Sequence, residues 1–500
     1  MPRIRSAGAL AFGWALLWTG AARAQFGRGA PEWMADGGDA QRSSWIRSDP
    51  KISVESLSKP GFQVAWKINL KHEPGVAATL DHYIGYRGFR SLALMGSPWG
   101  ELTAIDTDLG RVEWTKNLAA SAAQGGAGPC TGGMTASVVR PTTAAYPGAP
   151  AGRGGGGMFG RSGPAKSGVG QPGEGAVTIA EIAARTAAGP TGGRGPGRGP
   201  GGPGGPGFGR MPTLLDALSS DGMFHSMYIS NGEEPAAPLP FLPANANAHG
   251  LIVVDNIAYA ATSGGCGGAP NGIWALDLAS KQVVHWTPAG DIAGSTGFAL
   301  GPDGTVYAAT SSGELVALDP KTLQVKATYR SGDQAFVSSP AVFDYKTKAM
   351  VAAASKDGRL HLVDGASLSG AAYTAAISGE LASWQDAGGA RWILAPSKDS
   401  IVAWKVGGEG DTPVLQPGWT SREMASPMAP LVVNGVVFAV SNGSSAVLYA
   451  FNGVTGRELW NSGKAMTAPV RHGGLSGSGS QIYLGTTDGA IYAFGFPIEH

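Results

Sequence analysis

LTAIDTDLGRVEW, residues 102–114, contains the pattern that decides the fold. A short apolar run ends in Ala-Ile-Asp, a turn with glycine follows, and a second run ends in tryptophan. LYAFNGVTGRELW, residues 448–460, repeats the pattern with Asn452 at the aspartate position. Short β-branched and aromatic runs that are separated by Gly, Asp and Asn turns are typical of antiparallel hairpins. The pattern therefore predicts short β-strands joined by tight turns.

Copies of this pattern recur along most of the chain. The residue at the aspartate position, here called the anchor, is found at eight places: Asp106, Tyr228, Asp277, Asp319, Asp364, Lys405, Asn452 and Gly495. From Asp277 onward the separations run from 41 to 47 residues, which is the period of a propeller blade. No helical periodicity intervenes, so the sequence predicts an all-β fold, an eight-bladed β-propeller.

The ends of the repeat array predict how the ring closes. The last repeat stops at IYAFGF (491–496) and lacks an outer strand, whereas FQVAWKINL (62–70) is a strand without a repeat of its own. Pairing these two segments removes the exposed edges of the ring. We expect the N-terminal strand to complete the last blade.

The N-terminus predicts export. Arg3 and Arg5 precede an apolar run over residues 7–20, and Ala22-Arg23-Ala24 supplies a cleavage site, so residues 1–24 are predicted to be a signal peptide. The alternative, an uncleaved anchor, requires a longer run of about 20 apolar residues. We expect a periplasmic or secreted protein without a transmembrane segment after cleavage. A net charge of +1 does not favour nucleic acid as a partner.

The mature chain is expected to have two parts. A lead-in segment spans residues 25–61, and the propeller spans residues 62–500. A Gly/Pro/Arg-rich stretch at 143–210 interrupts the second blade, and its composition predicts a disordered surface insert. Its excess of arginine leaves an anionic partner open beside a purely solvated loop.

Cys130 and Cys266 are the two cysteines of the chain. An oxidising compartment permits them to form a disulfide, and two buried thiols remain the alternative. Two cysteines alone provide no haem-attachment motif, cysteine-rich zinc site or iron–sulfur cluster.

The anchors and the tryptophans are predicted to be structural. An aspartate that precedes a turn accepts hydrogen bonds from the N–H groups of that turn. Trp114, Trp286 and Trp460 recur eight or nine residues after an anchor, where a large ring can pack between neighbouring blades.

The pattern A-x-D-x-x-x-G-x-x-x-W at 104–114 resembles the docking repeat of the quinoprotein, or PQQ-like, propellers. WMADGGDAQRSSW, residues 33–45, is similar to the lead-in of PQQ-dependent dehydrogenases. The resemblance covers roughly residues 31–140 and 211–496. It implies an eight-bladed fold but leaves the activity open, because such repeats serve both dehydrogenases and protein-binding scaffolds of outer-membrane assembly.

The dehydrogenases of that family carry an adjacent Cys-Cys pair, and this sequence has none. Their calcium is held by Glu, Asn and Asp, with an Asp beside it as the base. Asn247 and Asp291 fall at comparable places and are the candidate metal ligands, with Asp291 as the candidate base, whereas Glu73 is a poor match for the glutamate. The cofactor expectation stays open between none and PQQ with calcium.

The connectors that lead into the innermost strands converge on the axis of a propeller, where ligands collect. Their polar residues form the predicted axial lining: Glu73, Asn245, Asn247, His249, Asp291, Asp333, Arg422, Glu423, Arg471 and His472. Carboxylates and amides of this set suit Ca²⁺, and its arginines suit the carboxylates of a quinone. The alternative is that these side chains only contact water.

Two functions follow. The first is an exported, monomeric binding or scaffold module of the cell envelope, whose central face contacts a protein or an envelope component. The second is an oxidoreductase, a PQQ- and calcium-dependent dehydrogenase of an alcohol or sugar. The sequence leaves open whether the chain is an enzyme.

Overall fold

The structure, a computed structural model, describes residues 33–85, 88–118, 130–142, 213–408, 413–470 and 474–497. The predicted signal peptide (1–24) and the predicted insert (143–210) lie outside these residues. Arg471 and His472 of the predicted axial lining lie outside them as well.

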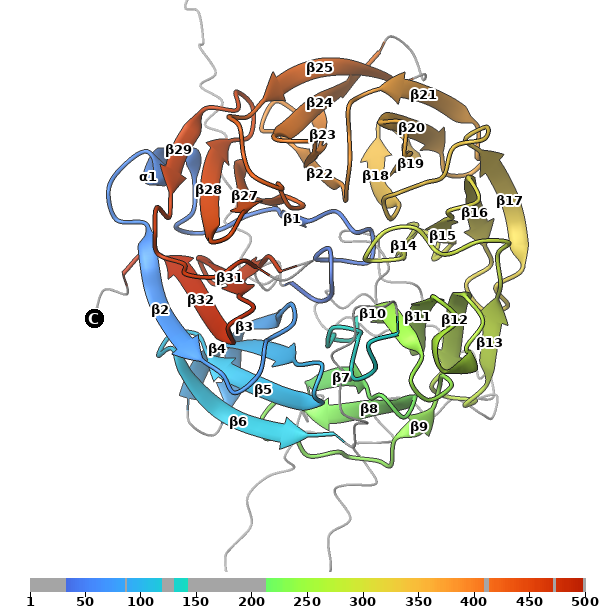
Figure 1. Cartoon of the computed structure of the whole chain (residues 1–500), viewed down its shortest axis with the longest axis horizontal. Coiled ribbons are helices and arrows are strands. Elements are labelled where there is room, and N and C mark those ends of the chain that lie inside the picture. Colours follow the sequence, from blue (N-terminus) through green and yellow to red (C-terminus); the bar gives the residue numbers. More distant parts are fainter. Residues whose placement is uncertain are drawn as a thin grey trace, which may run out of the picture.

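Eight β-sheets surround a central axis, so the predicted eight-bladed propeller is confirmed (Figure 1). In each blade the strands follow one another from the axis outward. The strands of blades 1 to 4 are β3 (Ala78–Gly85), β4 (Gly88–Gly96), β5 (Glu101–Asp106) and β6 (Arg111–Asn117); β7 (Leu214–Leu218), β8 (Met223–Tyr228) and β9 (Leu239–Pro240); β10 (Asn247–Val254), β11 (Ile257–Ser263), β12 (Gly272–Asp277) and β13 (Val283–Trp286); and β14 (Phe298–Leu300), β15 (Val306–Ala309), β16 (Glu314–Leu318) and β17 (Val325–Arg330). In blade 2, Val139 forms a bridge with Asp216 and takes the innermost place.

Blades 5 to 8 complete the ring. Their strands are β18 (Ala341–Tyr345), β19 (Lys348–Ala354), β20 (Arg359–Asp364) and β21 (Gly370–Thr374); β22 (Ala382–Gln385), β23 (Arg391–Pro396), β24 (Ile401–Gly407) and β25 (Val414–Thr420); β26 (Leu431–Val433), β27 (Val436–Asn442), β28 (Ala446–Asn452) and β29 (Glu458–Asn461); and β30 (Ser476–Ser478), β31 (Gln481–Gly485) and β32 (Ala490–Gly495). The fourth strand of blade 8 is β2 (Gln63–Asn69), which pairs antiparallel with β32. The predicted closure by the N-terminal strand is therefore confirmed.

The anchors have the predicted structural role. Asp106 Oδ1 accepts hydrogen bonds from the N–H groups of Asp108 and Leu109 at 3.1 and 3.0 Å. Asn452 Oδ1 does the same for Val454 and Thr455 at 2.9 and 3.0 Å. The side-chain oxygens at these positions hold the turn between the third and fourth strands, so they belong to the scaffold.

Tryptophans join neighbouring blades, as predicted. Trp114 of β6 donates its indole N–H to the carbonyl of Ile229 in blade 2, at 2.8 Å. Trp460 of β29 lies against blade 8, with its ring centroid 4.9 Å from that of Phe62 in an edge-on arrangement. The large rings at these two junctions bury apolar surface between neighbouring blades.

The glycine of the repeat makes room for these rings. Gly456 has a φ of +71°, and a Cβ there would lie 2.7 Å from the ring of Trp419 on the preceding blade. Gly110 has the same relation to Trp66, again at 2.7 Å. The glycine is required both for its left-handed backbone and for the close approach of the indole.

Between blade 7 and the axis lies β1 (Trp45–Ile46), which pairs parallel with β26. The short helix α1 (Val54–Leu57) follows, with Ser53 as its N-cap, before the chain turns outward to β2. The described part of the lead-in, from Trp33 onward, therefore runs from the centre of the ring to its rim (Figure 1). Among the described residues, no helix is both long and apolar enough to cross a membrane.

Candidate functional site: the central cavity

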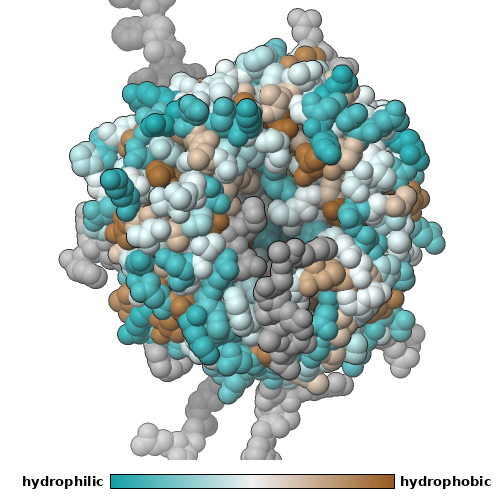
Figure 2. All heavy atoms as spheres, viewed as in Figure 1, coloured by the Kyte–Doolittle hydropathy of each residue, from teal (hydrophilic) through white to brown (hydrophobic). Residues whose placement is uncertain are grey.

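A cavity of about 420 Å³ lies on the propeller axis. All eight connectors that lead into the innermost strands contribute to its wall, as the blade geometry predicts. Figure 2 shows one face of the propeller with a hollow at its centre, and this face is here called the central face. The volume of the cavity is within the range of about 300–1,000 Å³ that is usual for small-molecule sites.

The lead-in forms the inner part of the wall, which the sequence analysis did not anticipate. Its backbone carbonyls accept hydrogen bonds from the inner edges of six blades, at distances of 2.7–2.9 Å. The pairs, acceptor first, are Trp33 with Thr79, Met34 with Arg140, Ala40 with Leu300, Gln41 with Val342, Ser43 with Ser383, and Ser44 with Val432. These bonds satisfy inner-strand N–H groups that would otherwise lack a partner in the ring.

The local sequence explains how the lead-in turns within so narrow a space. Gly37 and Gly38 have φ values of +73° and +88°, and a Cβ on Gly38 would lie 3.0 Å from the ring of Trp33. Asp39 then accepts hydrogen bonds from the N–H and the hydroxyl of Ser43, at 2.9 and 2.6 Å. The GGD motif is thus a turn with its own cap.

Arg42 joins this turn to the blades. Its guanidinium donates to the carbonyls of Phe298 (2.9 Å), Gly250 (2.6 Å) and Asp36 (2.5 Å). The residue is 2% exposed. Since its donors serve backbone carbonyls of the lead-in and of blades 3 and 4, Arg42 is primarily a structural cation.

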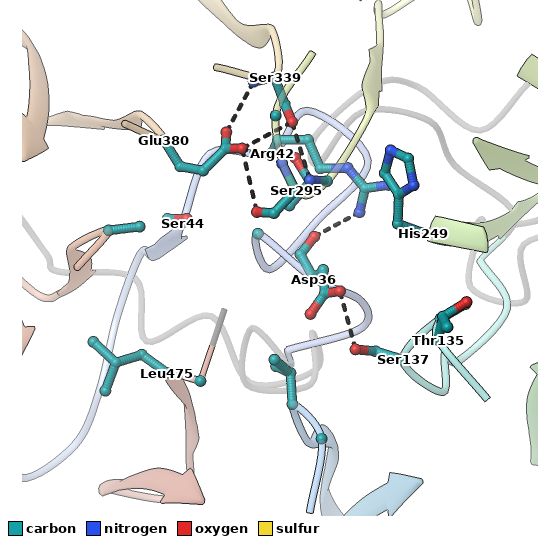
Figure 3. A pocket seen from close by; sticks show the side chains of 18 of the residues that line it. Asp36, Arg42, Ser44, Thr135, Ser137, His249, Ser295, Ser339, Glu380 and Leu475 are labelled. Carbon is teal, nitrogen blue, oxygen red and sulfur yellow. Dashed lines mark hydrogen bonds between the residues drawn. The ribbon is translucent and has the colours of Figure 1, made fainter. Parts of the chain in front are cut away.

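Asp36 lies beside Arg42 and points to the opposite side of the cavity (Figure 3). Its Oδ2 accepts a hydrogen bond from the hydroxyl of Ser137 at 3.0 Å, whereas its Oδ1 is buried without a partner. Burial raises the pKa of the Asp36 carboxyl, and the charge of Arg42 acts in the opposite direction. Asp36 is therefore the acid of the cavity with unused hydrogen-bonding capacity.

Glu380 occupies the wall on the side of blade 6. Its carboxylate accepts hydrogen bonds from the backbone N–H and the hydroxyl of Ser295, and from those of Ser339 at 2.9 and 3.2 Å. Burial raises the pKa of Glu380, and these donors oppose the rise. Glu380 thereby ties the connectors of blades 4, 5 and 6 together (Figure 3).

His249 of β10 lines the cavity next to Arg42 (Figure 3). Its Nε2 is buried without a hydrogen-bond partner. Burial, and second the charge of Arg42, lower the pKa of His249 to about 4. At neutral pH the imidazole is therefore uncharged.

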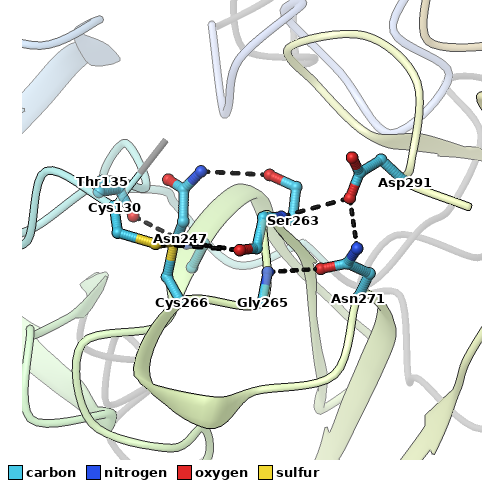
Figure 4. The surroundings of a disulfide bond; sticks show 10 residues. Cys130, Thr135, Asn247, Ser263, Gly265, Cys266, Asn271 and Asp291 are labelled. Carbon is cyan, nitrogen blue, oxygen red and sulfur yellow. Dashed lines mark hydrogen bonds between the residues drawn. A yellow bond between two sulfur atoms is a disulfide. The ribbon is translucent and has the colours of Figure 1, made fainter. Parts of the chain in front are cut away.

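Cys130 and Cys266 form a disulfide, with Cα atoms 5.3 Å apart. The bond connects the segment before blade 2 to the loop after β11 (Figure 4). Asn247 lies nearby and donates from its amide to the hydroxyl of Ser263 at 3.2 Å. The disulfide therefore fixes the part of the wall that carries Asn247.

Two residues of the predicted axial lining, Asn247 and His249, do line the cavity. Asp291 lies outside the lining, where its carboxylate accepts hydrogen bonds from the Gly264 N–H at 3.3 Å and from the Asn271 amide (Figure 4). Arg422 is exposed, lies outside the lining and forms an ion pair with Glu458 at 3.1 Å.

The remaining described members of the predicted set also lie outside the cavity lining: Glu73, Asn245, Asp333 and Glu423. Asn245 has a positive φ of 61° in a turn, and Asp333 and Glu423 are exposed. Asp333 and Glu423 follow closely on the outer strands β17 and β25, whereas Asn247 and His249 belong to an innermost strand. Asn245 lies only two residues before β10, but its N–H donates to the carbonyl of Ser220 at 2.6 Å, which keeps it in a turn beside blade 2.

Sequence reasoning missed Asp36, Arg42 and Glu380. The first two belong to the lead-in motif, whose central position no repeat pattern reveals. Glu380 belongs to the connector into blade 6, and the repeat period predicts that this connector reaches the axis. Within the described ranges, no group of three or more His, Cys, Asp or Glu side chains is arranged to hold a metal ion.

Comparisons with known proteins agree with this architecture. Residues 350–495 match the family model described as outer membrane protein assembly factor BamB. With the repeats and the eight blades, this match confirms the resemblance to the PQQ-like propellers. No curated protein sequence matches the chain at a significant level.

Solved structures share the fold at low identity. A quinohemoprotein alcohol dehydrogenase from Comamonas testosteroni has a TM-score of 0.59 at 13% identity, over 94% of this chain and 81% of its own. BamB from Moraxella catarrhalis has a TM-score of 0.51 at 13% identity, over 88% and 99%. The computationally designed Ika8 protein has a TM-score of 0.54 at 13% identity, over 87% and 100%. These likenesses concern the fold alone.

Proposed function

We propose that the protein is an exported binding module of the cell envelope that uses its central cavity to hold a group from a partner. The cavity carries this proposal, because connectors from every blade and the lead-in converge on it. Its polar side chains come from the lead-in (Asp36 and Arg42), from a connector (Glu380) and from the start of β10 (His249). A preorganised concave site of this kind is suited to recognition.

The hydrogen bonds within the cavity support binding rather than quinone chemistry. Arg42, the cation of the described lining, directs its donors to three backbone carbonyls, so it is not available to clamp a quinone carboxylate. The two cysteines bond to each other across 136 positions, which differs from the adjacent pair of the quinoprotein dehydrogenases. Asp291 is engaged by Gly264 and Asn271, so it does not join Asn247 in a shared ligand set.

A PQQ- and calcium-dependent dehydrogenase is the second candidate. The lead-in motif and the fold shared with a quinohemoprotein alcohol dehydrogenase favour it. The described residues do not fit the cofactor pair that the resemblance implies, for the reasons above. We therefore derive no catalytic step through PQQ or calcium.

Site-directed photo-crosslinking in the native host tests the proposal. A benzoylphenylalanine at position 295 replaces an exposed serine on the cavity wall, and one at position 326 replaces Lys326 on β17, far out on blade 4. We expect position 295 to give a defined adduct that maps to one partner segment, and position 326 to give none. Equal adducts from both positions, or none from 295, would refute binding through the central face.

A further inference from the structure

Among the described residues that line the central cavity, the acids outnumber the basic side chain. Asp36 and Glu380 line the cavity, and Asp39 belongs to the same lead-in turn as Asp36. Arg42 is the basic side chain of the described lining. Three of its five N–H donors are hydrogen-bonded to the carbonyls of Phe298, Gly250 and Asp36.

Unused hydrogen-bonding capacity is concentrated in the same place. Asp36 Oδ1, His249 Nε2 and Thr296 Oγ1 are buried without a partner, and all three residues line the cavity. A buried carboxylate oxygen without a donor is costly. His249 is neutral at neutral pH, so its unprotonated nitrogen can accept a hydrogen bond.

We propose that the cavity binds a primary alkylammonium group, the side chain of a lysine from a partner polypeptide, with Asp36 as its counter-ion. This inference rests on the binding function proposed above and specifies the chemistry of the bound group. An ammonium offers three donors and no acceptor, and its positive charge offsets the acids Asp36 and Glu380 of the described lining. A carboxylate or phosphate would instead meet Asp36 and Glu380 and be repelled.

A peptide mimic separates charge from shape. Isothermal titration of the purified full chain uses Nα-acetyl-lysine N-methylamide and, as the matched neutral probe, Nα-acetyl-norleucine N-methylamide. We expect the lysine probe to bind at least tenfold more tightly. We expect n-butylammonium to bind more weakly than the lysine probe, because it lacks the peptide groups; equal affinity would identify a free amine as the ligand and refute the polypeptide source.

Two matched variants assign the effect to one side chain. Asp36→Asn keeps the acceptor for Ser137 and removes the charge, so we expect it to lower the affinity for the lysine probe at least tenfold. Asp333→Asn neutralises an exposed acid outside the cavity, and we expect it to bind as wild type does. Circular dichroism establishes that both variants are folded; if Asp36→Asn is not, the comparison of the two probes on wild-type protein still decides.

The outcomes separate this inference from the binding function on which it rests. Equal binding of the lysine and norleucine probes, or an unchanged affinity in Asp36→Asn, overturns the ammonium site and indicates a neutral ligand or water. If position 295 still gives a defined adduct, the binding function stands without the ammonium. If the lysine probe binds and no adduct forms, the cavity takes the cation but the partner proposal fails.

Discussion

Replacing Arg42 by methionine tests whether the lead-in is held at the axis by one guanidinium. Methionine keeps an unbranched apolar stem beside the ring of Phe298, over which the Arg42 guanidinium lies at 5.3 Å. The change leaves the carbonyls of Phe298, Gly250 and Asp36 without this donor. Each unsatisfied buried acceptor costs about 1–3 kcal/mol, so we expect a loss of at least about 3 kcal/mol in the free energy of unfolding.

Thermal unfolding followed by circular dichroism measures this loss. The entropy of unfolding is about 2 cal/mol/K per residue, so 3–4 kcal/mol in a domain of several hundred residues corresponds to a fall in Tm of roughly 4–5 °C. Arg330→Met is the control, because the Arg330 side chain is 71% exposed and pairs only at the surface with Glu314. The cost of losing an exposed ion pair is about 0–1 kcal/mol.

Hydrogen exchange adds a local readout. The N–H groups of Leu300 and Val342 donate to lead-in carbonyls, so in Arg42→Met we expect them to exchange faster than the N–H groups of middle strands in the same blades. An Arg42→Met protein whose Tm and exchange rates equal those of Arg330→Met would refute the structural role given to this cation.

Three further predictions concern stability. Gly456→Ala places a Cβ against Trp419 at a φ of +71° and is expected to cost about 1–3 kcal/mol more in urea unfolding than Gly332→Ala, whose φ is +83° but whose Cβ meets nothing within 4 Å; equal costs would exclude a role for the indole contact. Burial raises the pKa of Asp216 to about 7, so its contribution to the free energy of unfolding is fully present below the unfolded-state pKa and is lost as the pH rises through 7. Between pH 4 and pH 8, the free energy of unfolding of Asp216→Asn is expected to rise by up to about 4 kcal/mol relative to that of wild type. A difference that does not change with pH would contradict this. The pKa of His249 is lowered to about 4, so its contribution to the free energy of unfolding is fully present above the unfolded-state pKa of about 6.5 and is lost as the pH falls through 4. Between pH 7 and pH 4, the free energy of unfolding of His249→Gln is expected to rise by up to about 3 kcal/mol relative to that of wild type. Parallel curves of stability against pH for the two proteins would disprove this.

The fold was predictable because its determinants are local and repeated. An anchor such as Asp106 acts within its own turn, and Gly110 and Trp114 act at one blade junction, so each copy carries the complete signal. Even the degenerate second repeat was located correctly, since Tyr228 ends the third strand of blade 2. Closure by β2 followed from counting strands.

The site was only partly predictable because it depends on contacts that are distant in sequence. Asn247 and His249 line the cavity because they lie at the start of an innermost strand, a place that the repeat pattern indicates. Arg422 was expected there, but it lies closer to the preceding outer strand and pairs with Glu458. Asp36 reaches the centre through bonds between the lead-in and strands more than 40 positions away, which no repeat encodes.

Whether the central face binds a partner or a quinone is tested most directly by incubating the purified full chain with PQQ and Ca²⁺ and then desalting it. We predict that no quinone absorbance is retained and that an alcohol or sugar does not drive dye reduction, because the cation and the acids of the cavity are arranged for neither cofactor. Stoichiometric retention of the quinone with substrate-dependent dye reduction would contradict the binding function and establish a dehydrogenase.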